Sequence, residues 1–446
     1  MKVPLVSIRD CFEGVIPSII ATLDAAGQPN VSYLSQVYLV DDEHVALSNQ
    51  FFSKTAANVA ATGRAHVLVV SGLTGEQFAL DVEHRASLTE GAVFAKMSAQ
   101  LTAISSQHGV GEAMVLRSAE LYRVSECQAI PGPPMLADAA APPAAQDRLA
   151  LAAKVAAAIA AQSDAEAMID AAINGLTNAF GFANTMLLML DDDGGRLATL
   201  ASRGYAQGGA GAEVTLGEGA IGIAAATGQA VRLSDMSRGQ RMVAAVRATS
   251  TLDAERLIAL PGLNQPQSQL AAPMVSRGKV QGVLFAESSE RFWFGPEDEE
   301  AMMLIGGQLA ASLRLAELEA RETETAAAKS EPSVSGGEIR VRYFAHDDSL
   351  FLDDAYLIKG VPGRLLFHFL TVFAQTGRRD FTNREIRLEA SLRLPGLKDN
   401  LETRLILLRR RLEEKAAPIR LARPGRGQIR LELDGVPRLE TAPPAG

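Results

Sequence analysis

The segment LSNQFFSKTAANVAATGRAHVLV, residues 47–69, places a polar turn between two strand-like runs. The first run ends in Ser-Asn-Gln, and the second, AHVLVV, is short and apolar, as a buried strand is. Between them, Ser53, Lys54 and Thr55 precede a short stretch of helix-forming residues. A helix beginning near Thr55 would bring free backbone N–H groups beside a lysine and two hydroxyls, which together make an anion site. The simpler alternative is that Ser53 or Thr55 caps the helix and Lys54 is solvated.

Short strand-like runs flank this segment on both sides. Residues 17–24 and 29–40 are joined by the glycine-containing turn AAGQ, which is typical of a hairpin. Residues 90–109 have helical periodicity and end at a glycine. The remaining runs are HVALSNQ (44–50), RAHVLVV (64–70), QFALDVEHRASL (77–88) and ELYRVSE (120–126). Many short strands with few helices predict a small β-barrel.

Composition divides the chain of 446 residues into three parts. Residues 132–146 are rich in Pro and Ala, and residues 323–337 are polar and end in Gly-Gly, so both segments are expected to be linkers. The predicted domains are therefore 1–131, 147–322 and 338–440. The predicted fold class is multidomain α+β.

The net charge of −9 is unevenly distributed along the chain. Residues 337–440 hold 20 Lys and Arg against 15 Asp and Glu, a net charge of +5, so the rest of the chain carries −14. A basic domain on an acidic chain favours a nucleic-acid partner. The sequence shows no kinase, cyclase or phosphate-loop signature and no plausible nucleophile–base pair.

Cysteine usage and hydropathy indicate a soluble, cytoplasmic protein. Cys11 and Cys127 lack metal-site spacing and are expected to be reduced structural thiols. The N-terminus lacks the apolar region of a secretory signal, and no apolar run reaches about 18 residues, so no membrane span is expected.

The third part begins with clear helix signals. Residues 363–377 put several large apolar side chains on one helical face and end at a glycine. Thr382 and Glu385 have the spacing of a capping box that starts a second helix. Residues 399–415 predict a third helix with a leucine stripe, and residues 418–433 predict two strands around a basic turn.

Three helices followed by a basic hairpin resemble the winged-helix effector domain of two-component response regulators. The stretch LLRRRLEEKAAPIRLARPGRGQIRL, 407–431, carries the resemblance, although no receiver domain with a phosphorylatable Asp precedes it. The resemblance implies that the third helix enters a major groove and that the hairpin follows phosphates. The alternative is a protein-contact role, because Ile406 and Leu407 lie off the leucine stripe. The residues expected to contact DNA are Asn400, Thr403, Arg404, Arg410 and Arg411 on the helix, and Arg423, Arg426 and Arg430 on the hairpin.

The second part resembles a GAF domain, a small-molecule sensor fold. The stretches GEGAIGIAAATGQAVRLSD (217–235), AAPMVSRGKVQGVLFAES (271–288) and FGPEDEEAMMLIGGQLAASLR (294–314) carry this resemblance. A long helix is expected over residues 148–179, and another over 298–321 would transmit the sensed state to the next domain.

The ligand of this second domain is open. It contains no histidine and no cysteine, so neither a histidine-ligated haem nor a thioether-linked bilin is expected there. Arg241, Arg247 and Arg256 are candidates to face an anionic ligand, or are solvated surface charges. The alternative role for the domain is dimerisation without a ligand.

The first part resembles the pyridoxamine 5′-phosphate oxidase-like FMN-binding split barrel. The residues that carry the resemblance are GVIPSIIATLDAAGQPNVSYLSQVYLVDDEHVALSNQFFSKTAANV (14–59) and MVLRSAELYRVSE (114–126). It implies a flavin at a dimer interface, with its phosphate held by Lys54, Ser53 and Thr55. Asn49 and Gln50 are then expected at the phosphate or the ring, and Ser35, Gln36 and Val37 along the isoalloxazine edge.

Two departures bear on this cofactor assignment. The barrel ends at SECQAIPGPP without the Arg-rich substrate segment of the oxidases, so pyridoxamine phosphate oxidation is not expected. Related barrels bind deazaflavin or haem in place of FMN, and His66, His84 and His108 are the candidate haem ligands.

The leading hypothesis is a homodimeric transcriptional regulator, more a sensor than an enzyme, in which a flavin-binding split barrel and a GAF domain control a DNA-binding winged helix. The alternative is a flavin-dependent oxidoreductase whose other two domains are regulatory. A third option is a barrel that has lost its cofactor and only assembles the dimer.

Overall fold

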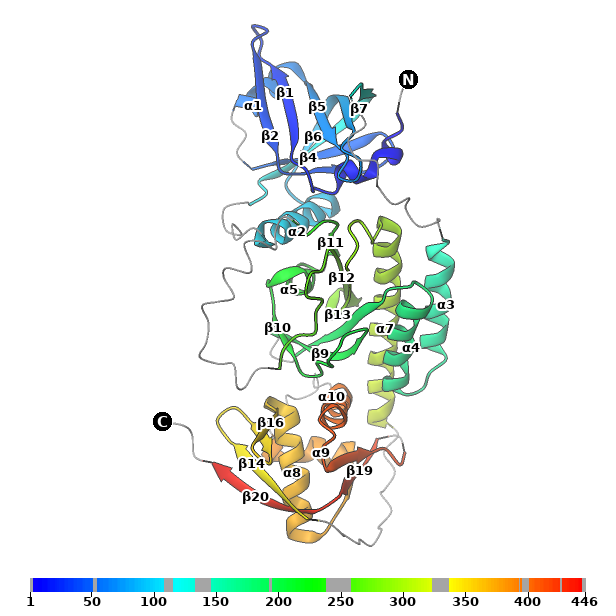
Figure 1. Ribbon diagram of the computed structural model, residues 1–446, viewed down its shortest axis with the longest axis vertical. Helices are drawn as coiled ribbons and strands as arrows, with labels where there is room; N and C mark the ends of the chain where they lie inside the picture. Colours follow the sequence, from blue (N-terminus) through cyan, green and yellow to red (C-terminus); the bar gives the residue numbers. More distant parts are fainter. Residues whose placement is uncertain are drawn as a thin grey trace.

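Three domains are stacked along the longest axis of the molecule, with the N-terminal domain at one end and the C-terminal domain at the other (Figure 1). The computed structural model describes residues 3–50, 54–107, 115–132, 146–191, 195–237, 258–322, 337–392, 394, 401–425 and 427–442. Outside these ranges lie most of both predicted linkers and the candidate residues Ser53, His108, Arg241, Arg247, Arg256, Asn400 and Arg426.

The N-terminal domain is a seven-stranded antiparallel sheet in the order β2-β1-β5-β6-β7-β4-β3. Its two ends approach each other, since β2 also contacts β4, so the sheet curls into an incomplete barrel around one apolar core. The run expected to be one strand over 29–40 is two strands that part at Ser35 and Gln36. The elements are η1 (Leu5–Phe12), β1 (Ser18–Leu23), β2 (Pro29–Leu34), β3 (Val37–Leu39), β4 (His44–Asn49), α1 (Lys54–Thr62), β5 (Arg64–Val70), β6 (Gln77–Leu88), α2 (Ala92–Gln107) and β7 (Ser118–Ile130).

The central domain is a six-stranded sheet, β10-β9-β8-β13-β12-β11, covered on both faces. Alternate residues of β8 enter different cores: Leu187 and Met189 pack with α3, α4 and α7, whereas Met186 and Leu188 pack with α5. Burial on both faces explains why this strand is apolar throughout. The elements are α3 (Arg148–Ala160), α4 (Ala165–Asn178), β8 (Asn184–Leu190), β9 (Arg196–Arg203), β10 (Glu213–Thr215), α5 (Gly219–Thr227), β11 (Val231–Leu233), β12 (Ser268–Ser276), β13 (Lys279–Ser288) and α7 (Pro296–Glu322).

The prediction of one helix over residues 148–179 is wrong. The chain leaves the helix after Ala160 and restarts at Ala165, and the two pieces pack against each other. Asp164 lies in an extended conformation and its carboxylate accepts the N–H groups of Glu166 and Ala167, as an N-cap does. The alanine-rich composition on both sides hides this cap in the sequence.

The C-terminal domain has the element order that the sequence predicts: three α-helices and then a hairpin. The capping box of Thr382 and Glu385 is present with both of its hydrogen bonds. Five strands were not anticipated: β14, β15 and β16 precede the first helix, β17 precedes the second, and β20 follows the hairpin and pairs in parallel with β14. The elements are β14 (Glu338–Phe344), β15 (Ser349–Leu352), β16 (Ala355–Ile358), α8 (Gly360–Thr376), β17 (Asp380–Thr382), α9 (Asn383–Leu388), η4 (Ala390–Leu392), α10 (Leu401–Glu414), β18 (Ile419–Ala422), β19 (Gln428–Leu433) and β20 (Val436–Ala442).

Two helices connect the domains. Helix α2 lies between the barrel and the central domain: Met97 and Leu101 pack with barrel residues, whereas Ala99 and Ala103 pack with the α5 side of the central domain. Helix α7 runs along the side of the central domain toward the C-terminal domain (Figure 1). None of the helices within the described ranges is long and apolar enough to cross a membrane.

Candidate functional site

The first predicted anion site lies where α1 meets strand β2. Lys54 is the first residue of α1 and is exposed, so its ammonium group is free to approach an anion beside the helix N-terminus. Thr55 is buried, and its hydroxyl bonds the Nδ2 of Asn30 at 3.0 Å and the Oγ of Ser32 at 3.1 Å. Thr55 therefore links the first turn of α1 to β2 by hydrogen bonds. The groups available to an anion are the ammonium group of Lys54 and the first backbone N–H groups of α1.

Ser35 and Gln50 lie together next to this turn. The hydroxyl of Ser35 donates to Oε1 of Gln50 at 2.6 Å. Gln50 is buried, and its Nε2 has no hydrogen-bond partner within the described part of the chain. A buried amide without an acceptor costs about 1–3 kcal/mol, so this atom is suited to an acceptor on a ligand.

Gln36 and Val37 point elsewhere. Val37 is buried in the barrel core. Gln36 faces the side of the barrel next to the central domain. A Cβ added to Gly14 would lie 4.0 Å from Cγ of Gln36 and 3.0 Å from Cδ1 of Ile104, so Gln36 lies near helix α2. The structure thus separates these two residues from Ser35, although the resemblance placed Ser35, Gln36 and Val37 along one edge of the isoalloxazine ring.

Asn49 is part of a hydrogen-bond network that the sequence did not predict. Its Nδ2 donates to Oγ of Ser118 at 3.0 Å and to Oε1 of Glu120 at 3.3 Å. Glu120 also accepts from Ser118 at 2.6 Å, from Ser87 at 2.5 Å and from Nε2 of His84 at 2.9 Å. Burial by itself would raise the pKa of Glu120, but these hydrogen bonds outweigh burial and lower it.

This network bears on the haem alternative. His84 directs Nε2 at Glu120, and His66 pairs through Nδ1 with Asp81 at 2.8 Å on an exposed face. The third candidate, His108, lies outside the described residues. Lys54 at a helix N-terminus and the Nε2 of Gln50, which has no acceptor in the described part of the chain, are groups that suit the phosphate and the ring edge of a flavin.

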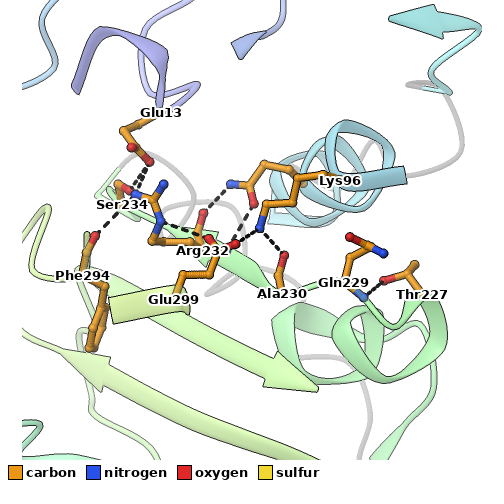
Figure 2. A network of polar contacts seen from close by, with 10 residues as sticks. Glu13, Lys96, Thr227, Gln229, Ala230, Arg232, Ser234, Phe294 and Glu299 are labelled. Atoms are coloured by element: carbon orange, nitrogen blue, oxygen red, sulfur yellow. Dashed lines mark hydrogen bonds and ion pairs between the residues drawn. The ribbon is translucent and has the colours of Figure 1, made fainter. Parts of the chain in front are cut away.

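A buried ionic junction joins the barrel to the central domain (Figure 2). Arg232 of β11 pairs with Glu13 at 2.5 Å and with Glu299 of α7 at 3.4 Å. Lys96 of α2 also pairs with Glu299 and donates to the backbone oxygen of Ala230 at 2.7 Å. Two cations thus face two carboxylates, which makes the junction electrically balanced although little water reaches it.

The charges of the junction shift one another's protonation. Burial by itself would lower the pKa of Arg232, but the carboxylates of Glu13 and Glu299 outweigh burial and raise it. Burial lowers the pKa of Lys96, and Glu299 opposes that effect. Burial, and then the charge of Glu299, raise the pKa of Tyr38 of β3, so the Tyr38 hydroxyl lies within reach of the charges of the junction. The strand that follows Ser35 therefore borders the junction.

A second buried carboxylate lies inside the central domain. Glu287 of β13 accepts the N–H of Leu263 at 2.7 Å and the Nε2 of Gln269 at 3.2 Å. Burial raises its pKa, because the charged form is poorly solvated. The hydroxyl of Thr199 is also buried, with no partner in the described part of the chain. Sequence reasoning missed Glu287 as a buried carboxylate, because its partners Leu263 and Gln269 come from other segments of the chain.

Arg410, a predicted DNA contact, lies against the central domain. Its guanidinium group donates to Asp170 of α4 at 2.8 Å and to the backbone oxygen of Leu200 at 3.3 Å, and it lies 3.6 Å from Glu166. Arg409, which the sequence did not single out, also contacts Glu166.

Two further predicted DNA contacts are engaged within the molecule. Arg411 is buried and donates from Nε to the backbone oxygen of Leu357 at 2.8 Å. Arg423 pairs with Glu402 at 2.7 Å and with Asp164, the N-cap of α4, at 3.4 Å.

The remaining described candidates lie toward solvent. Arg430 of β19 pairs with Asp380 at 2.6 Å, and Thr403 and Arg404 of α10 are partly exposed. The structure therefore places Arg410 and Arg423 at the contact with the central domain.

Family models match two of the three domains. Residues 7–125 match the pyridoxamine 5′-phosphate oxidase model, and residues 162–314 match the GAF domain model. No curated protein matches the chain.

Solved structures resemble the same two regions. An FMN-binding protein from Syntrophomonas wolfei subsp. wolfei is 16% identical, with 29% of this chain and 88% of that chain covered and a TM-score of 0.25. The GAF domain of an Acinetobacter phosphoenolpyruvate-protein phosphotransferase is 21% identical, with 41% and 98% covered and a TM-score of 0.31. A free methionine-R-sulfoxide reductase from Neisseria meningitidis is 19% identical, with 40% and 96% covered and a TM-score of 0.31. The chain thus joins a pyridoxamine 5′-phosphate oxidase-like barrel to a GAF domain.

Proposed function

We propose that this protein is a sensor that binds a flavin in its barrel and regulates the binding of DNA by its C-terminal domain. The observation that carries the flavin assignment is the site at α1. An exposed lysine stands there at a helix N-terminus, next to a buried glutamine whose amide has no acceptor in the described part of the chain.

Lys54 and the first N–H groups of α1 would hold the flavin phosphate. Gln50 would donate its free amide hydrogen to the ligand, with its orientation fixed by Ser35. Asn49 would lie next to the ionised Glu120, whose charge disfavours further negative charge nearby. A bound flavin supplies a group that accepts and releases electrons, and the chain's own residues hold and orient it.

A second copy of the chain is part of the proposal. Strand β2, at one edge of the sheet, exposes Val31 and Tyr33, which are 66% and 78% accessible and lie on one face of the strand. Large apolar side chains in such positions favour burial against a partner, and self-association of identical edges gives a two-fold dimer.

The C-terminal domain is proposed to be a winged helix that binds DNA. Its support is the net charge of +5 over residues 337–440 and the order of three helices and a hairpin. The GAF domain is proposed to bind a small-molecule ligand, and the buried carboxylate of Glu287 is the group proposed to contact that ligand.

The visible absorption spectrum of the purified protein, followed by titration with FMN, tests the flavin site. We expect flavin bands and an affinity that falls about tenfold or more in Lys54→Ala, because the lysine supplies the only side-chain cation proposed for the phosphate. Lys279→Ala is the matched control, since Lys279 is an exposed lysine on the β12–β13 turn of another domain. A colourless protein that takes up no FMN would exclude the flavin, and equal affinities of Lys54→Ala and wild type would exclude the phosphate assignment.

An FMN-dependent oxidoreductase is the second candidate, because the His84–Glu120 pair places a titratable imidazole next to Asn49. Steady-state oxidation of a reduced nicotinamide would favour it. Salt-dependent binding of the full chain to duplex DNA, without such turnover, favours the sensor.

A further inference from the structure

Helix α10 has a second buried face besides the one in its own domain. Leu405, Leu408 and Leu412 pack in the core of the C-terminal domain, but Ile406 and Leu407, which lie off that stripe, are buried as well. The reason is that α10 packs against α4 and β9 of the GAF domain. Figure 1 shows α10 on the side of the C-terminal domain that faces the GAF domain.

Carboxylates of α4 meet the arginines of α10 across this contact. Glu166 and Asp170 are four residues apart and therefore lie on one face of α4, where they pair with Arg409 and Arg410. The side chains of Arg410 and Glu166 are only 15% and 13% exposed, so water screens this pair weakly. Removal of the carboxylates would leave the buried guanidinium group of Arg410 without a counter-charge, whereas Arg409 keeps Glu413 at 3.6 Å.

The contact extends to the hairpin and to the end of α10. Arg423, just after β18, pairs with Asp164 at the start of α4. At the other side, Glu414 accepts the backbone N–H of Ala210 at 3.1 Å. The same helix and hairpin that are proposed to approach DNA are thus both held by the GAF domain.

We infer that α4 of the GAF domain blocks the DNA-binding surface of the C-terminal domain, with Glu166 and Asp170 occupying the positions of DNA phosphates. This inference rests on the proposed DNA-binding function and adds its regulation. The side chain of Arg410 is covered at this contact and only 15% exposed, so a phosphate can reach its guanidinium group only when the two domains separate. The observed affinity for DNA is then reduced by the fraction of molecules that are open.

Helix α7 connects the junction at the barrel with the C-terminal domain. Helix α7 carries Glu299, which belongs to the junction with the barrel, and also Glu317, which lies 3.9 Å from Arg387 of α9. A cofactor or ligand that favours one position of α7 would therefore act on both ends of the same rigid helix.

The test compares two double variants of the full chain. Glu166→Gln with Asp170→Asn removes the two carboxylates that face α10 and preserves side-chain size. Asp81→Asn with Glu83→Gln removes the same two charges from an exposed strand of the barrel, so it controls for net charge. Each protein is titrated with a fluorescent mixed-sequence duplex about three helical turns long, and hydrogen exchange of α4 and α10 is measured without DNA.

We expect the first variant to bind the duplex about tenfold more tightly than wild type, with faster exchange in α4 and α10, and the barrel variant to differ from wild type by less than about threefold. Equal affinity and equal exchange in the first variant and wild type, with duplex binding present, would overturn the blocking contact alone. Faster exchange without duplex binding by any of the proteins would overturn the DNA-binding function, and the inference with it. Asp170→Asn alone, at a half-exposed position, is expected to act in the same direction should the double variant not fold.

Discussion

The buried junction between the barrel and the GAF domain offers the sharpest test of the domain arrangement. Arg232→Met removes the charge that Glu13 and Glu299 share, while the aliphatic part of the side chain is approximately preserved. The backbone of Arg232 stays held, because the side chain of Gln100 bonds both its N–H and its carbonyl oxygen. The substitution therefore removes the ionic contact and keeps the two hydrogen bonds between Gln100 of α2 and the backbone of Arg232.

The structure sets the size of the effect. The side chain of Arg232 is 14% exposed, and loss of one partner from a buried pair costs about 3–5 kcal/mol. The lower end applies, since Glu299 keeps Lys96 and Glu13 keeps the hydroxyl of Ser234 at 2.9 Å. We therefore expect about 3 kcal/mol, which makes opening of the junction about 150-fold more frequent.

Hydrogen exchange of the α2 amides measures that opening, because α2 lies between the two domains. Arg196→Met is the matched control: Arg196 is 54% exposed and pairs with Glu213, so its loss should change exchange by less than about threefold. Glu13→Gln added to Arg232→Met should recover part of the loss, since no charged carboxylate then remains at that end. Equal exchange in Arg232→Met and Arg196→Met would refute the claim that the junction holds the domains together.

Two further predictions concern the barrel and the GAF domain. The pKa of Glu120 is lowered in the folded state from its ordinary value of 4.5. The ionised carboxylate therefore contributes its full stabilisation above that pH, and this contribution is lost as the pH falls below it. Glu120→Gln should flatten the acid side of a plot of the urea midpoint of unfolding against pH, and an unchanged plot would contradict this. A Cβ on Gly175 would stand 2.5 Å from Cγ1 of Val155, so Gly175→Ala should destabilise the α3–α4 pair by about 1–3 kcal/mol. Val155→Ala in the same chain should relieve that clash, and a thermal melt in which the double variant is no more stable than Gly175→Ala would argue against it.

Local chemistry made much of the fold predictable. The capping box at Thr382 needs only two side chains three residues apart, and the C-terminal stop of α8 needs only Gly377 in the left-handed conformation at φ 74°. The position of Lys54 could be predicted for the same reason, since it lies at the first residue of α1, whereas the anion that it would hold stays a prediction.

The interfaces were not predictable in the same way. Periodicity shows that a helix face is apolar, but not what covers it, so the second buried face of α10 and the two buried faces of α2 could not be assigned to partners. The break before Asp164 was missed because alanines on both sides favour a helix equally well.

The sequence by itself determined the chemical groups: a lysine at a helix start, a basic third domain, and apolar runs with the periods of strands and helices. Only the tertiary structure decided which of these groups face each other. Arg410 and Asp170 are 240 residues apart, and Arg232 and Glu13 are 219 apart. A charge in a sequence carries no information about its partner, because electrostatic pairing depends on distance and burial in space.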